Sequence, residues 1–304
     1  MFFIFLGGEL SLSNCNRKLN VKNKFKVIVL LFCFISFYFL KINFKTEDNN
    51  VLVSNDLVTD SISYQNWNED DLFLKDNANS TLDKINYIAS LDPRFKIVLE
   101  NYEKYPESLL QMLIRNNDMS EFVLDYLKYE GKSFADTIGK VEKDEVPLLL
   151  QYDKRWGYAF YGEHVIAING CGPTSLAMVA SYLTGNVKNT PAVIADYAFS
   201  HGYYSDVGTS WDLFTTGALK FGIKGKVIPF SKESVFKELE SGRPIICSMR
   251  KGDFTTTGHF IVLVGVKDGK IQVNDSNSQK RSAKLWDYET LEYQIKNLWA
   301  FTIA

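Results

Sequence analysis

A short turn that leads into a helix carries the residue best suited to covalent chemistry. Cys171 lies between Gly170 and Gly172, and Pro173 follows, which suits the first turn of a helix because its missing N–H would have no partner there. Apolar residues then recur at helical spacing as far as Gly185, which is expected to end the helix. Unpaired backbone N–H groups and the positive end of the helix dipole favour a thiolate at this place. Cys171 is therefore a candidate nucleophile, and its two glycines are expected to let a substrate backbone come close.

The alternative interpretation of a free cysteine is a small buried side chain in the core. We interpret Cys247 in that way, because it lies in the apolar run 244–249, which predicts a strand. The chain has four cysteines and three histidines, and no two cysteines form a C-x-x-C pair. A zinc cluster is therefore not expected.

A nucleophilic cysteine needs a general base, and His259 is the best candidate. It opens the apolar strand predicted over 259–266, directly after a loop rich in Gly and Thr. A histidine there would be held by the sheet while its ring stays near solvent, as a general base requires. His164 precedes the cysteine by only seven residues, and His201 lies in a polar loop. The alternative for His259 is a strand-end ring hydrogen-bonded to backbone.

A third group should orient the imidazole, and Asp275 ends the strand that follows. If the turn between the two strands covers residues 265–269, Asp275 lies directly opposite His259. If residues 268–269 alone form a tight hairpin, Asp275 points away. The triad therefore requires the looser turn or a β-bulge. Asn274 is the alternative orienting residue.

Acyl transfer also needs donors for the developing oxyanion. The backbone N–H of Cys171 is one, and a side-chain amide commonly supplies a second. Gln151 follows an apolar segment just before the loop that leads to the cysteine. Its alternative role is that of an ordinary solvated loop residue.

The elements that must position these residues extend over 146–304. Predicted helices come first and predicted strands follow, which indicates an α+β fold with an antiparallel sheet. Besides the helix after Cys171, the expected helices begin near Pro191 and cover 210–221 and 232–240, and the expected strands cover 227–229, 243–249, 259–266, 270–275 and 298–303.

Residues 81–145 read as a helical accessory segment. Asp92–Pro93 and Tyr105–Pro106 open two short amphipathic helices, and Asp118 or Ser120 caps a third. Such helices bury too little surface to fold alone, so we expect them to pack on the domain that follows. The alternative is a pro-segment or lid over the site.

The first part of the chain predicts membrane attachment. Residues 27–44 are apolar apart from Lys41, which could extend to the interface, and residues 1–26 carry an excess of Lys and Arg. We interpret 1–26 as a cytoplasmic basic N-terminus and 27–44 as a transmembrane signal anchor that places the rest of the chain outside the cell. A cleaved signal peptide and secretion are the alternative. Residues 45–80, rich in Asn, Asp and Ser, read as a polar linker.

The composition and net charge of the chain bear on which classes of partner it can bind. The chain has 304 residues, with 34 Lys and Arg against 36 Asp and Glu, and the formal net charge is −2. No run of basic residues offers a phosphate-binding stripe, so no nucleic-acid partner is expected.

Taken in order, four pieces of the sequence resemble a known family: Gln151, then Gly-Cys-Gly-Pro-Thr-Ser at 170–175, then Gly-His-Phe-Ile-Val at 258–262, then Val-Asn-Asp at 273–275. This order is similar to that of the bacterial papain-like cysteine peptidases that process bacteriocins at double-glycine leaders, in their stand-alone, exported branch. The resemblance covers residues 146–304.

The resemblance implies a papain-like fold with Cys171 as nucleophile, His259 as base, Asp275 as orienting residue and Gln151 as oxyanion donor. The segment between Gln151 and Cys171 is longer than in papain and is expected to loop out. No metal or organic cofactor is implied, and the partner implied is a peptide or protein substrate. A surface module that binds peptide or cell-wall material without catalysis, and an amidase or acyltransferase with the same triad, are the alternatives.

Overall fold

The computed structural model describes Trp67 and residues 80–304, which all belong to one compact unit. The predicted basic N-terminus 1–26 and signal anchor 27–44 lie outside the described residues, as does most of the predicted linker 45–80. Of the helices in the described part, none combines the length and the apolar character needed to cross a membrane.

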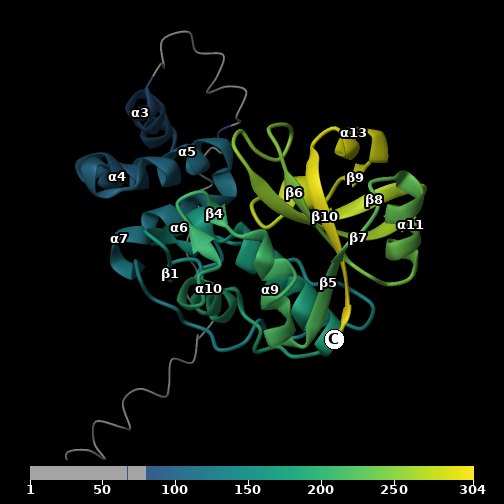
Figure 1. The fold of residues 1–304 in the computed structure, drawn as a ribbon. Helices are drawn as coiled ribbons and strands as arrows, with labels where there is room; N and C mark the ends of the chain where they lie inside the picture. Colours follow the sequence, from purple (N-terminus) through teal and green to yellow (C-terminus); the bar gives the residue numbers. More distant parts are fainter. Residues whose placement is uncertain (1–66, 68–79) are drawn as a thin grey trace, which may run out of the picture. The chain divides into compact units, whose positions relative to one another are not determined.

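A six-stranded antiparallel sheet dominates the second half of the chain, which confirms the predicted α+β class (Figure 1). Its central strands are formed by apolar, β-branched runs, as expected for strands covered on both faces. In spatial order the strands are β5 (Ile223–Val227), β10 (Ile295–Ile303), β6 (Ile245–Met249), β7 (His259–Lys267), β8 (Lys270–Asn274) and β9 (Leu285–Trp286).

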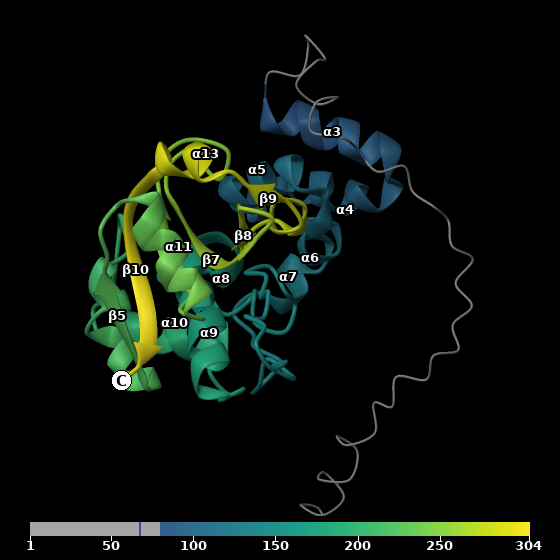
Figure 2. The same ribbon diagram turned by 90° about the vertical axis from the view of Figure 1, so that its right-hand side faces the viewer.

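Helices cover both faces of this sheet. Successive strand side chains point to opposite faces, so Ile246 packs toward α9 (Cys171–Thr184) while Cys247 packs toward α11 (Lys232–Glu240). Cys247 is thus the buried strand residue that the sequence predicts. Figure 1 shows α9 and α11 on opposite sides of the strands, and Figure 2 gives the view from the side of α11.

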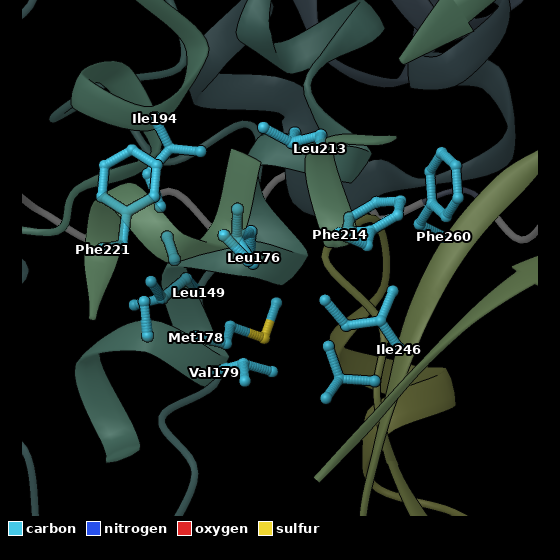
Figure 3. Packing of buried hydrophobic residues seen from close by; sticks show 14 of the residues in the cluster. Leu149, Leu176, Met178, Val179, Ile194, Leu213, Phe214, Phe221, Ile246 and Phe260 are labelled. Atoms are coloured by element: carbon cyan, nitrogen blue, oxygen red, sulfur yellow. The ribbon is translucent and has the colours of Figure 1, made fainter. Parts of the chain in front are cut away.

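Helix α9 is held by the largest apolar cluster of the described chain. Its residues Leu176, Met178 and Val179 are fully buried in one cluster with Ile246 of β6 and Phe260 of β7 (Figure 3). Each such side chain stabilises the fold by about 1.5–3 kcal/mol on burial. This packing fixes the helix, and with it Cys171, relative to the strand that begins at His259.

Short elements surround this core. The helix expected at Pro191 is α10, whose N-cap Thr190 accepts a hydrogen bond from the backbone N–H of Val193. The prediction of an α-helix over 210–221 is wrong: two 3-10 turns take its place, because the chain leaves helical geometry at the β-branched Thr215.

The remaining elements are α10 (Pro191–Ser200), the turns Trp211–Phe214 and Gly217–Phe221, α8 (Ile166–Asn169), α12 (Gln279–Ser282), α13 (Tyr288–Glu292), and the two-residue strands β1 (Phe160–Tyr161), β2 (His164–Val165), β3 (Tyr204–Ser205) and β4 (Gly208–Thr209).

The accessory segment folds as short helices with a second apolar cluster. That cluster includes Tyr152, Tyr158, Val165 and Ala167 from the segment before Cys171, and Phe122 stacks on Tyr158 with ring centroids 4.1 Å apart. The accessory helices therefore pack on the domain that follows, as expected. They are α3 (Thr81–Leu91), α4 (Lys96–Glu100), α5 (Glu107–Arg115), α6 (Ser120–Leu124) and α7 (Tyr126–Tyr129), with 3-10 turns at Pro93–Phe95, Tyr102–Lys104 and Asn117–Met119.

Candidate active site

Cys171 is the first residue of α9, as the sequence predicts. Pro173 lies within the first turn, and the helix ends at Gly185, whose left-handed φ of 67° favours glycine. The thiol is partly exposed, and the cysteine is not in a disulfide. Its backbone N–H belongs to the first helical turn, where donors have no acceptor within the helix.

The glycines beside Cys171 do not have the role that the sequence suggested. A Cβ on Gly172 would lie 2.7 Å from Oγ1 of Thr209, and one on Gly170 would lie 2.5 Å from the carbonyl oxygen of Ile166. Both glycines are buried. They allow close packing within the protein rather than close approach of a substrate.

His259 begins β7, but its ring is less open to solvent than expected. The residue is only 8% exposed. Helix α9 crosses β7 and covers this part of the sheet, which accounts for the burial. The ring still borders the same cleft as Cys171.

The strands β7 and β8 are joined by the tight turn at residues 268–269, where both residues have positive φ. The alternative with a looser turn over residues 265–269 is therefore wrong. A β-bulge at Val264 adds one residue to β7 and shifts the register between Leu263 and Gly265. Because side chains alternate along a strand, this single residue returns Asp275 to the face of His259.

Asp275 approaches His259 diagonally rather than from the directly opposite position, because the residue before it, Asn274, pairs with Val262. Asn274 is not the orienting residue. Its side chain is buried and donates a hydrogen bond of 2.9 Å to the carbonyl oxygen of Val146.

The Asp275 carboxylate is fully buried and hydrogen-bonded on both oxygens. Oδ1 lies 2.7 Å from Nε2 of His259 and accepts from the backbone N–H of Asn277 at 2.8 Å. Oδ2 accepts from Nε of Arg281 at 2.5 Å. The backbone N–H of Asp275 donates to Oγ of Ser282 at 2.9 Å. The carboxylate thus has little freedom to move, and it fixes the imidazole.

These contacts set the charges of the pair. Burial lowers the pKa of His259, but the negative charge and hydrogen bond of Asp275, together with a hydrogen bond to the Cys171 thiol, raise it overall to about 10. Burial by itself raises the pKa of Asp275, yet the charges of His259 and Arg281 hold it below its usual value. The site therefore favours an imidazolium between a carboxylate and the sulfur. Because Nε2 is hydrogen-bonded to Asp275, Nδ1 is the ring nitrogen left to bond the thiol of Cys171.

Gln151 is buried at the same cleft and is not a solvated loop residue. Its backbone N–H donates to the carbonyl oxygen of Ser276 at 2.8 Å, and its Oε1 accepts from Oγ of Ser276 at 3.0 Å. Nε2 donates one hydrogen to the carbonyl oxygen of Ala167 at 2.6 Å, and an amide has a second to give. The side chain is oriented from both ends, as an oxyanion donor must be.

The segment between Gln151 and Cys171 does not loop out. Trp156 and Tyr161 are fully buried, Nε1 of Trp156 donates to the carbonyl oxygen of Leu150 at 2.8 Å, and the Tyr161 hydroxyl lies 2.9 Å from Oγ1 of Thr209. The extra residues fold into the core because they are largely aromatic and apolar.

A cleft of about 530 Å³ brings Cys171, His259 and Gln151 together. Two of its contributors were not singled out in the sequence: Arg281, which holds Asp275, and the face of α5 that carries Arg115. No sequence signal marks the α5 face, because it is polar and helical like any solvated face. A larger cavity, of about 790 Å³, is lined by residues 139–144 and by α9 near its end, and contains neither cysteine nor histidine.

The second half of the chain is similar to a known protein family. The family model described as Peptidase_C39 like family matches residues 143–302, which is more than half of the chain. No curated protein matches.

Three solved structures are similar over about half of this chain. The peptidase domain of Streptococcus ComA, a bifunctional ABC transporter involved in a quorum-sensing pathway, is 19% identical and aligns over 53% of this chain and 98% of its own, with a TM-score of 0.37. A double-glycine motif protease from an AMS/PCAT transporter, solved with a leader peptide, has 20% identity, coverage of 53% and 94%, and a TM-score of 0.36. A C39-like peptidase from Bacillus anthracis has 16% identity, coverage of 54% and 98%, and a TM-score of 0.36.

Proposed function

The chain belongs to the Peptidase C39-like family of cysteine peptidases, and from that premise we propose that it hydrolyses peptide bonds with a triad of Cys171, His259 and Asp275. The observation that carries the proposal is the buried His259–Asp275 pair, 2.7 Å between Nε2 and Oδ1, facing the thiol of Cys171 across one cleft. A nucleophile, its base and the group that orients the base are the parts that acyl transfer requires.

The residues act in two half-reactions. The Cys171 thiolate attacks the carbonyl carbon of the scissile amide, an S–C bond forms, and the carbonyl π electrons move to oxygen. As the tetrahedral intermediate collapses, the C–N bond breaks and the His259 imidazolium gives its proton to the leaving amine. Water then attacks the thioester while His259 takes a proton from it, and the acid product leaves as the Cys171 sulfur is released. Asp275 keeps its charge throughout and holds the ring.

The oxyanion of each tetrahedral intermediate is assigned to two donors. One is the backbone N–H of Cys171 at the start of α9, and the other is the second N–H of the Gln151 amide. The Gln151 side chain is buried and hydrogen-bonded at both ends, and the Cys171 N–H is held by α9, so little reorganisation is needed when charge develops.

The test is the pH dependence of iodoacetamide labelling of Cys171 in the full-length chain and in His259→Ala. An ion pair with His259 predicts fast labelling already well below the free-cysteine pKa of about 8.5, and loss of that acidic reactivity in the variant. Cys247 serves as an internal control, because it is fully buried and burial raises its pKa. Labelling that is slow and indifferent to His259 would remove the basis for a peptidase and favour a module that only binds.

For location, we propose that residues 27–44 anchor the chain in the membrane with 1–26 in the cytoplasm and the peptidase domain outside the cell. The apolar stretch and the excess of Lys and Arg before it support this. A membrane-impermeant maleimide added to intact cells should label Cys171 and spare Cys15 until the cells are opened. Equal protection of both thiols would contradict an external domain, and recovery of the chain in the medium without residues 1–44 would indicate a cleaved signal peptide.

A further inference from the structure

Helix α5 forms part of the catalytic cleft although it lies outside the residues that the family model matches. Ser108, Gln111, Met112 and Arg115 of α5, with Asn116 after it, line the cleft that contains Cys171 and His259. We propose that α5 is a specificity element of this peptidase, and that Arg115 selects a carboxylate on the peptide substrate. This inference rests on the proposed function.

The α5 wall is a built part of the unit and not a loose cover. Its other face buries Leu109, Leu110, Leu113 and Ile114 in the accessory cluster. At the cleft, Nδ2 of Asn116 donates to the carbonyl oxygen of Asn277 at 2.9 Å, and Nη1 of Arg115 donates to Oγ1 of Thr256 at 3.4 Å. The helix is thus tied to the loop after Asp275 and to the loop before His259. A peptide that reaches Cys171 passes beside it.

Arg115 is the positively charged side chain of the cleft that can still bind an anionic ligand. Its side chain is exposed, and within the described part of the chain no carboxylate lies within ion-pair distance of it. The other cations at the cleft, His259 and Arg281, both bond Asp275. The acidic residue on the cleft wall, Asp253, already accepts a hydrogen bond of 2.7 Å from Nε2 of Gln294.

The surroundings of Arg115 add positive charge. A second cavity, of about 310 Å³, shares Arg115 and Arg281 with the catalytic cleft. Lys280 and Lys284 also line this second cavity. Besides Asp253, which lines both cavities, its acidic residue is Asp118. The planar guanidinium can donate two parallel hydrogen bonds to one carboxylate, which a lysine cannot do. The ligand class is therefore a carboxylate, from an Asp or Glu side chain near the scissile bond or from the C-terminus of the peptide.

The experiment uses the full-length chain and internally quenched peptides that carry Glu, Gln or Lys at one position at a time. Each peptide is made with a free and with an amidated C-terminus, so that the two sources of the carboxylate are distinguished. The variants are Arg115→Gln, Arg115→Glu and, as a matched control for loss of one positive charge, Lys96→Gln on the exposed face of α4. Cys171 labelling by iodoacetamide confirms that each variant retains its active site.

The expected result is a preference of up to about fivefold in kcat/KM for the acidic peptide at one position, the upper end for a solvent-exposed ion pair. Arg115→Gln should abolish the preference, Arg115→Glu should transfer it to Lys, and Lys96→Gln should leave it unchanged. If the wild type cleaves the peptides but Arg115→Gln leaves the ratio of kcat/KM for the Glu and Gln peptides unchanged, the inference about Arg115 is overturned and the proposed function stands. Failure of the wild type to cleave any peptide overturns the proposed function and this inference with it.

Discussion

The two walls of the cleft differ in how firmly their polar side chains are held. On the sheet side, His259 is buried and bonded to an Asp275 carboxylate that has partners on both oxygens. On the α5 side, Arg115 is exposed, and its contact with Thr256 is a long 3.4 Å. Bond making and breaking tolerates little displacement of the base, whereas recognition of a charged group works with a mobile side chain. The difference teaches that the pair proposed to act in catalysis is held rigidly, whereas the side chain proposed to select the substrate is free to move.

The largest expected effect comes from removing the base on the rigid wall. His259→Ala should lower kcat/KM by about 10⁴-fold, because the thiolate loses its ion-pair partner and the leaving amine loses its proton donor. Steady-state cleavage of a quenched peptide measures this. A loss of only a few-fold would show that the sheet wall is no more critical than the α5 wall.

A smaller loss is expected at the oxyanion donor. Gln151→Ala should lower kcat by about 10²-fold with little change in Cys171 labelling, because the amide acts only as charge develops on the substrate oxygen. Ser276→Ala is the matched control: it removes the partner of Gln151 Oε1 and leaves the amide N–H groups in place. If Gln151→Ala raises KM and leaves kcat unchanged, Gln151 binds the ground state instead.

The charges of the rigid wall should be visible in stability as well. The folded pKa of His259, about 10, lies above its unfolded value of about 6.5. Folding therefore favours the protonated ring, and this contribution is complete below about pH 6.5 and declines as pH rises toward 10. Asp275, with its lowered pKa, contributes in the opposite sense and loses its contribution in acid.

Urea unfolding of the wild type and of His259→Ala at several pH values tests this. The difference in the free energy of unfolding between the two proteins should shrink from pH 6.5 to pH 10. A difference that grows over this interval would mean that His259 is held neutral in the folded protein.

The least effect on turnover is expected from core residues far from the cleft. Ile85→Ala in α3 and Ile194→Ala in α10, both fully buried, should each lower the free energy of unfolding by about 2–5 kcal/mol, the usual cost of a large-to-small change in a core. Because the accessory cluster includes Tyr152, Tyr158, Val165 and Ala167 from the segment before Cys171, both variants should shift one common transition. Two separate transitions in Ile85→Ala would show that the α5 wall can detach from the peptidase core.

Local sequence determined much of the catalytic side of this protein. The start of α9 at Cys171 follows from Pro173 and the apolar spacing after it, and its end follows from Gly185. The apolar runs around Cys247 and after His259 specified buried strands, and the helix expected over 232–240 is α11. These signals are short-range, so each can be interpreted without the rest of the chain.

Other features required the assembled molecule. The roles of Gly170 and Gly172 depend on Ile166 and Thr209, which pack against them. The burial of His259 depends on the position of α9 over the sheet. The accessory helices have ordinary amphipathic sequences, and only their packing beside Tyr152 and Tyr158 turns the outer face of α5 toward the cleft that contains Cys171.

By itself, the sequence determined which side chains could serve as nucleophile, base, orienting acid and amide donor, because residue type and strand-end position are local properties. The tertiary structure decided which of them meet. A single extra residue in β7 at Val264 chooses Asp275 over Asn274, since one inserted residue exchanges the two faces of a strand. Arg281 and α5 join the site through long-range packing, because contacts between distant segments depend on the whole fold rather than on any one stretch of chain.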